Sequence, residues 1–200
     1  MEVAFGMRAH SGWAAVVGLA SGDGRIVVCE RRRIELVEQI WAKQPYHAAE
    51  RLSADRARDT VARGIAAADR IAARELHALI RRQEEQGHRV TACALVAGAP
   101  MPAWTIAEIV AVHFRMHKAE GVLFRDALTR AAAACGIRLV AIPEKQLASH
   151  AACALHTAAG RLTAKITALG KTAGPPWGKD QKDAALAAMV ALRAPDAAIS

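Results

Sequence analysis

The sequence predicts an α/β fold in which a mixed sheet carries helices on both faces. An apolar segment at residues 3–20 and strand-like segments at 25–30 and 33–37 follow one another with short connections, which indicates an antiparallel meander of three strands. Helical and strand-like segments then alternate in the order β-β-β-α-β-α-β-α-α, which adds parallel strands and places helices on both sides of the sheet. Hydrophobic residues make up 53% of the 200 residues, and the many alanines among them favour long helices over an all-β core.

The first helix and the strand after it have clear start and stop signals. Residues 38–52 are expected to be irregular, with Pro45 as a breaker, and Ser53 is the expected N-cap of the helix. Gly87 ends this helix, and the uncharged run at 90–96 is typical of a buried central strand. The apolar stripe of the helix, at spacings of three and four residues, consists of Val61, Ile65, Ala68, Ala72, Leu76 and Leu79.

The remaining helices and strand are predicted by the same kind of signals. Thr105 and Glu108 form a capping box that begins a helical region extending to about Cys135. Residues 137–142 indicate another short buried strand, and a further helix is expected over residues 146–169.

Length and composition predict one domain, over residues 1–195, with a last helix that begins at Asp180 and a frayed tail at 196–200. The four cysteines do not have the spacing of a zinc knuckle or a redox motif, which fits a reducing compartment. No signal peptide is evident, and no segment reaches the roughly 18 apolar residues of a membrane helix. We therefore expect a cytoplasmic protein without a membrane partner.

The charge of the chain favours an anionic partner. Lys and Arg number 27 against 19 Asp and Glu, which gives a formal net charge of +8. Nucleic acid is the natural candidate, although a generic basic soluble protein has the same balance. Arg31 and Arg32 lie in a short basic cluster that could contact phosphates.

Two segments at opposite ends of the chain carry a resemblance to a known family. They are Gly6-Met7-Arg8-Ala9 with the following Gly12-Trp13-Ala14-Ala15-Val16-Val17, and Asp180-Gln181-Lys182-Asp183 with the following alanine-rich helix. A helix–strand unit at 119–142 lies between them. With these segments the chain resembles, over most of its length, the RuvC-like Holliday-junction resolvases of the ribonuclease-H-like superfamily.

The resemblance implies a ribonuclease-H-like fold and a carboxylate cluster that holds two Mg²⁺ ions roughly 4 Å apart. Arg8 stands where the first-strand acid of these nucleases is expected, and a guanidinium repels a metal ion. The buried strand that should end in an acid reads without one over residues 92–98. The leading hypothesis is therefore a catalytically degenerate domain that binds nucleic acid or a protein partner. Its contacts to nucleic acid would include Arg8, Arg31, Arg32 and Lys179.

Two alternatives stay open. In the first, the chain is a metal-dependent phosphodiesterase or nuclease that binds Mg²⁺ or Mn²⁺ with a rearranged ligand set. Its catalytic residues would be His10, Glu120, Asp180 and Asp183, with Asp180, Asp183 and His117 as metal ligands. In the second, the chain is an interaction module that forms a homodimer through its alanine-rich helices.

Each candidate residue also has a simpler explanation. Asp180 and Asp183 serve equally well as the N-cap and a first-turn carboxylate of the last helix, and either could pair with Arg8. His113 and His117, with Glu120 at the next turn, share one face of a helix, a spacing that suits one transition metal. Surface histidines without a metal have the same spacing. If the helix packs as in the resolvases, His10, His117 and Glu120 would form a polar site beside Arg8.

Overall fold

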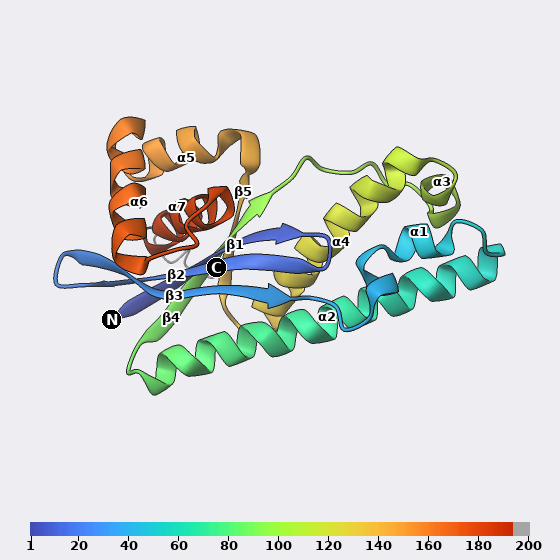
Figure 1. Cartoon of the computed structure of the whole chain (residues 1–200), viewed down its shortest axis with the longest axis horizontal. Helices are drawn as coiled ribbons and strands as arrows, with labels where there is room; N and C mark the ends of the chain where they lie inside the picture. The colour runs from blue at the N-terminus through green and yellow to red at the C-terminus, as the bar shows by residue number, and fades with distance from the viewer. Residues whose placement is uncertain (194–200) are drawn as a thin grey trace, which may run out of the picture.

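A five-stranded mixed sheet forms the centre of the molecule in a computed structural model that describes residues 1–193 (Figure 1). Its strand order is β3-β2-β1-β4-β5. β1, β2 and β3 are antiparallel neighbours, whereas β4 and β5 run parallel to β1, which confirms the predicted meander with added parallel strands. The strands are β1 (Glu2–His10), β2 (Trp13–Gly22), β3 (Arg25–Glu35), β4 (Arg89–Ala97) and β5 (Arg138–Pro143).

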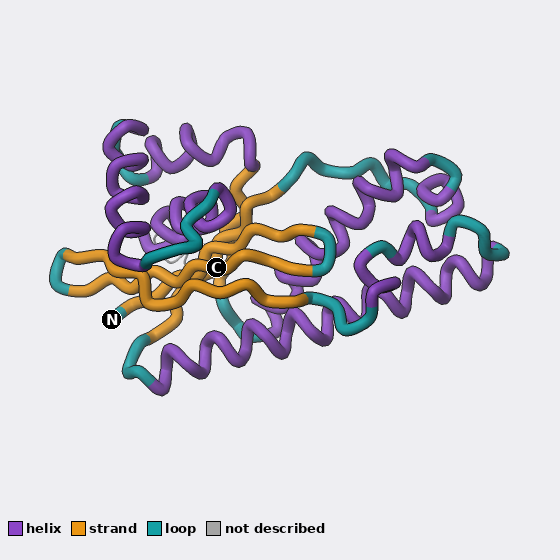
Figure 2. Tube along the Cα trace, viewed as in Figure 1, coloured by secondary structure: helices purple, strands orange, loops and turns teal. Residues whose placement is uncertain are grey.

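Helices cover both faces of this sheet, as predicted (Figure 2). One face packs against α2 (Ala54–Glu85) and α4 (His113–Ala134). The other face packs against α5 (Leu147–Ala154), α6 (Ala159–Ala173) and α7 (Lys179–Arg193). At one end of the molecule, α2 and α4 extend beyond the sheet and pack there against short helices (Figure 1).

The side chains of β1 alternate between the two helical layers. Val3, Phe5 and Met7 are fully buried in the core that includes α2 and α4. Ala4 is buried in the other core, and Gly6 touches α7 on that same side. Since neighbouring side chains on a strand point to opposite faces, the next residue in this row, Arg8, also belongs to the side of α7.

The meander has the predicted number of strands but different boundaries. Residues 3–20 do not form one strand, because residues 11 and 12 make a tight turn in which Gly12 has φ +84°. Residues 25–35 form one continuous strand instead of two, with a register shift opposite Gly18 and Leu19. Glycine tolerates the left-handed backbone that this turn requires, so Gly12 marks a reversal of direction.

Several predicted helical segments are also divided differently. Residues 38–52 contain η1 (Ile40–Lys43) and α1 (Pro45–Ala49), because Pro45 occupies the first helical position and begins a helix. The capping box at Thr105 is confirmed, but it caps the short α3 (Ile106–Val110), which an extended residue separates from α4.

The helix expected over residues 146–169 is wrong as a single element. The chain instead forms η2 (Glu144–Gln146), α5 and α6, and His156 between the two α-helices has φ +47°. This left-handed residue cannot continue a right-handed helix. The predicted tail at 196–200 lies outside the described residues. Among residues 1–193, no helix has the length and the apolar character needed to cross a membrane.

Candidate functional site

Close packing of α7 on β1 fixes the geometry of the candidate site. Gly6 lies directly under α7, since a Cβ at this position would stand 2.7 Å from the carbonyl carbon of Ala184 and 2.8 Å from the amide nitrogen of Ala188. Asp180 precedes Ala184 by one helical turn, which is about 5.4 Å along the helix. Arg8 follows Gly6 by two residues, which is roughly 6.6 Å along the strand. The contact at Gly6 therefore places the start of α7 over Arg8.

The guanidinium of Arg8 is held by three carboxylates from α7 and the end of β5. Its Nη1 donates to Asp183 Oδ2 at 2.6 Å, and its Nη2 donates to Glu144 Oε1 at 2.6 Å. Its Nε lies 2.9 Å from Asp180 Oδ1. Lys179 Nζ adds contacts of 2.6 Å to Asp183 and 3.3 Å to Glu144. We call these five residues the Arg8 cluster; the pairing of Arg8 with the two aspartates is the predicted one.

Charge stabilisation within the Arg8 cluster is mutual. The hydrogen bond from Arg8, followed by the contact with Lys179, holds the pKa of Glu144 below its ordinary value of 4.5. The hydrogen bond to Asp183 raises the pKa of Lys179. Burial opposes the charge of Arg8, but Glu144, Asp183 and Asp180 outweigh it and raise the pKa of the guanidinium. The cluster is thus a network of paired charges at neutral pH.

His10 lies at the edge of this network. Its Nε2 is 3.2 Å from Asp180 Oδ1, without the alignment of a hydrogen bond. Its ring stacks on Trp13 with 4.2 Å between the centroids, and the guanidinium of Arg33 lies 3.9 Å from the centre of the Trp13 ring. His10 therefore lies between the Trp13 ring and the start of α7.

A second guanidinium lies at the end of β4, which sequence reasoning did not single out. Arg125 of α4 packs over Gly98, where a Cβ would meet its Nη1 at 2.8 Å and its Nη2 at 3.1 Å. Burial lowers the pKa of Arg125, and the nearby carboxylates Asp126 and Glu144 offset this only in part. Within residues 1–193, the guanidinium of Arg125 makes no hydrogen bond or ion pair, although its main-chain oxygen accepts a hydrogen bond from Thr129. The only signals in the sequence are the small residues Gly98 and Gly121, which are too common to be specific.

The residues of this site do not fit the pair of Mg²⁺ ions that the resemblance implies. The first-strand position carries Arg8, whose guanidinium already binds the carboxylate oxygens that would face a metal. Guanidinium nitrogens donate hydrogen bonds and cannot act as metal ligands. The end of β4 brings the cation Arg125 in place of an acid. We therefore assign no chemical step to metal ions at this site.

The other residues singled out in the sequence have different surroundings. Arg31 donates to the main-chain oxygens of Gly174 and Pro176, so it anchors the turn before α7 to β3. Arg32 pairs with Glu30 at 3.6 Å and stays 47% exposed. Sequence reasoning also missed Glu144, because its position depends on how β5 ends beside α7.

The predicted grouping of His10, His117 and Glu120 beside Arg8 is wrong. The carboxylate of Glu120 accepts hydrogen bonds from His47 of α1 instead. α1 and α7 lie in different parts of the elongated molecule, because α1 packs on the portion of α2 and α4 that extends beyond the sheet (Figure 1). Glu120 therefore cannot complete a ligand set with Asp180 and Asp183, and the same holds for His117, which lies next to His47.

Comparisons with known proteins agree with this architecture. RuvC from Thermus thermophilus superimposes with a TM-score of 0.52 and 13% sequence identity, over 94% of this chain and 92% of the RuvC chain. T. thermophilus RuvC in complex with a Holliday junction substrate gives a TM-score of 0.51 and 13% identity, over 95% and 92%. No protein-family model matches the sequence, and a search of curated proteins finds no match.

This chain has the ribonuclease-H-like fold of RuvC. At 13% identity the likeness concerns the fold alone. It covers nearly the whole of both chains, so it extends over the sheet and the helices on both of its faces.

Proposed function

We propose that this chain is a RuvC-like domain that binds nucleic acid without metal-dependent strand cleavage. The observation that carries the proposal is the Arg8 guanidinium held among Asp180, Asp183 and Glu144. Two-metal cleavage needs carboxylates that are free to neutralise two divalent ions. In this site the Arg8 guanidinium already pairs with them. Of the two acid positions expected from the resemblance, the first carries Arg8, and the end of β4 faces the guanidinium of Arg125.

Binding to nucleic acid is supported by charge and by similarity. The chain has a formal net charge of +8, and a RuvC structure of the same fold was solved in complex with a Holliday junction substrate. Arg125 offers a half-buried guanidinium without an ion pair in the described part of the chain. Lys179 is 68% exposed at the edge of the Arg8 cluster. A phosphate group would complete the hydrogen bonds that a planar guanidinium makes best.

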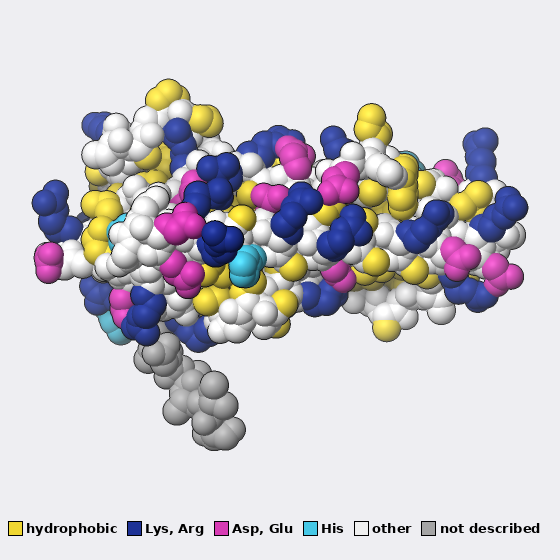
Figure 3. Space-filling model, turned by 90° about the horizontal axis from the view of Figure 1, so that it is seen from below, with side chains coloured by type: hydrophobic (Ala, Val, Ile, Leu, Met, Phe, Trp, Pro, Cys, Tyr) yellow, Lys and Arg dark blue, Asp and Glu magenta, His cyan; other side chains and the backbone are white. Residues whose placement is uncertain are grey.

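Arginines on other surfaces are paired with acids, which favours the region of Arg125 and Lys179 as the phosphate-binding site. On the face seen from below, Lys and Arg side chains are spread along the molecule with Asp and Glu among them (Figure 3). Arginines of α2 are paired with acids, for example Arg74 with Glu38 at 3.0 Å and Arg81 with Glu85 at 3.2 Å. Arginines that already have acidic partners contribute less to binding phosphates than Arg125 would.

Fluorescence anisotropy with a labelled four-way junction, a duplex and a single strand tests the binding. We expect an affinity that falls as salt rises, with a slope of about 0.9 for each phosphate contact on duplex DNA. Arg125→Met and Lys179→Met should each weaken binding and lower the slope by about 1. The matched control is Arg89→Met, because Arg89 is 73% exposed and lies at the opposite end of β4. Equal loss in all three variants would refute a phosphate contact at the site.

Cleavage assays with Mg²⁺ or Mn²⁺ test the second part of the proposal. The natural chain should release no product, and Arg8→Asp should gain affinity for Mn²⁺ because it adds an acid beside three carboxylates. Metal-dependent cleavage that is lost in Asp183→Asn would instead establish a nuclease with a rearranged ligand set. A stable dimer without affinity for any nucleic acid would favour an interaction module.

A further inference from the structure

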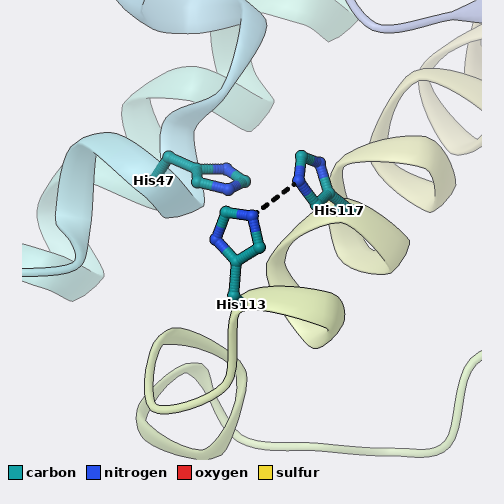
Figure 4. A group of neighbouring side chains, drawn as sticks. All are labelled: His47, His113 and His117. Carbon is teal, nitrogen blue, oxygen red and sulfur yellow. Dashed lines mark hydrogen bonds between the residues drawn. The ribbon is translucent and has the colours of Figure 1, made fainter.

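Three histidines converge at the part of the molecule that extends beyond the sheet, although they come from distant parts of the sequence. His47 belongs to α1, and His113 and His117 lie one turn apart on α4 (Figure 4). One ring nitrogen from each lies within 4.8 Å of the other two. The Nε2 atoms of His113 and His117 are 3.1 Å apart, and both rings lie against His47 with centroid distances of 5.0 and 4.6 Å.

A buried carboxylate orients the first of these histidines. Glu120 is fully buried, and its Oε1 lies 2.8 Å from His47 Nδ1 and accepts the backbone N–H of His47 at 3.3 Å. Because a carboxylate only accepts hydrogen bonds, we assign the proton to Nδ1, which leaves Nε2 of the neutral ring with a lone pair. A histidine that donates to a carboxylate through one nitrogen and binds through the other is the usual arrangement at metal centres.

The polar atoms around the three rings are not satisfied by protein groups. His47 Nε2 and Glu120 Oε2 are buried, and neither has a hydrogen-bond partner among residues 1–193. His113 and His117 are exposed and contact each other through Nε2, so the unsatisfied ring nitrogen of the group is that of His47. Buried polar groups normally have partners, and a bound ion is one of the few explanations for such atoms.

The basic residues of α4 leave this face clear. Arg115 and Lys118 lie over Trp104, at 4.7 and 5.8 Å from its ring centre, and a helix repeat of 3.6 residues turns both by about 100° or more from His113 and His117. No Lys or Arg of the described chain pairs with Glu120. A negative charge, that of the Glu120 carboxylate, therefore lies directly behind His47.

We propose that His47, His113 and His117 bind one divalent transition-metal ion of the zinc class, with Glu120 as the positioning carboxylate. Two nitrogens at about 2.0–2.1 Å from a tetrahedral Zn²⁺ stand roughly 3.3 Å apart. The separation of 3.1 Å on α4 is close to this requirement, and a ring nitrogen of His47 lies within 4.8 Å of both. Water takes the fourth position, since two of the histidines are exposed.

The histidine site and the Arg8 cluster differ in the metal ions that their side chains would bind. Zn²⁺ and Co²⁺ bind neutral imidazole, whereas Mg²⁺ prefers carboxylate and water oxygens. The proposed metal joins α1 to α4, so it locks the η1–α1 segment onto the helical extension of the sheet. It does not depend on nucleic-acid binding, and either proposal can fail without the other.

Titration with ZnCl₂ in an isothermal calorimeter, on protein first treated with EDTA, tests the proposal. We expect saturable binding of a single equivalent and a rise in the unfolding midpoint that EDTA reverses. CoCl₂ should give the visible absorption of four-coordinate Co²⁺, while MgCl₂ should give no heat or spectral change. His117→Ala should abolish the saturable binding, and because this side chain is exposed, the variant should fold.

Glu120→Gln tests the positioning role, because the amide keeps the shape of the side chain but removes its charge. We expect affinity for Zn²⁺ about 10–100-fold weaker, as for other partners of metal-bound histidines. His77→Ala is the matched control, since His77 is an exposed histidine of α2 outside the cluster. Absence of saturable binding in the natural chain, or binding that survives His117→Ala unchanged, would overturn the proposal.

Discussion

Replacing Arg8 with methionine tests whether the Arg8 cluster stabilises the fold. The substitution keeps the apolar stem of a side chain that is only 14% exposed but removes the charge among three carboxylates. Hydrogen bonds between charged groups contribute about 1.5–3 kcal/mol each. The contact with Glu144, which is 46% exposed, is limited by solvent to at most about 1 kcal/mol. Since the contacts are coupled, we expect a loss of about 2–3 kcal/mol in the free energy of unfolding.

The measurement is urea or thermal unfolding of the natural chain and the variant, followed by circular dichroism. For a domain of this size the expected loss lowers the midpoint by about 4–12 °C at neutral pH. The difference should depend on pH in one direction. Because the folded pKa of Glu144 lies below 4.5, its stabilising effect is complete above that value and is lost as the pH falls through the folded pKa. The gap between the two proteins should therefore narrow below about pH 4.5.

Arg89→Met is the control, because the ion pair between Arg89 and Glu2 is on the surface and should contribute less than about 0.5 kcal/mol. A loss at Arg8 no larger than this control, or a loss that stays constant into acid, would refute the interpretation of the cluster as a network of stabilising charge pairs.

Two further outcomes follow from the packing. Gly6→Ala should cost about 1–3 kcal/mol in unfolding free energy, because its methyl group would overlap the backbone of α7 at Ala184; an unchanged midpoint would mean that α7 does not pack on Gly6. Burial raises the pKa of Cys29 to about 11 and that of Cys93 to about 12, whereas Cys153 is exposed. At about pH 8 a thiol reagent, followed by mass spectrometry of peptides, should modify Cys153 first and Cys93 only after unfolding.

Most of the fold could be predicted because its signals are local. The uncharged run at 90–96 and the apolar stripe on α2 are each visible within a short stretch of sequence. The boundaries that went wrong depend on single backbone conformations. The reversal at Gly12 lies inside an apolar segment, and the break at His156 has no adjacent glycine or proline that would indicate it.

The candidate site was predictable only in part. The pairing of Arg8 with Asp180 and Asp183 could be expected, because the resemblance places the first strand and the last helix side by side. Glu144 and Arg125 could not, since the position of Glu144 depends on where β5 ends beside α7, and that of Arg125 on how α4 packs over Gly98. His47 had no signal of any kind, because it lies 66 residues before His113 and meets it only through the packing of α1 on α4.

The guanidinium of Arg8 supplies the positive charge that the three carboxylates of the Arg8 cluster need in order to lie together. When α7 docks on β1, it brings Asp180 and Asp183 beside Glu144, and these carboxylates would repel one another in the absence of positive charge. The guanidinium supplies that charge permanently, because its pKa lies far above neutral pH. The positive charge that offsets these carboxylates when α7 docks is thus part of the chain itself. Under the proposed function, a phosphate would meet Arg125, whose guanidinium has no ion pair among residues 1–193, and Lys179, which is paired within the cluster but 68% exposed.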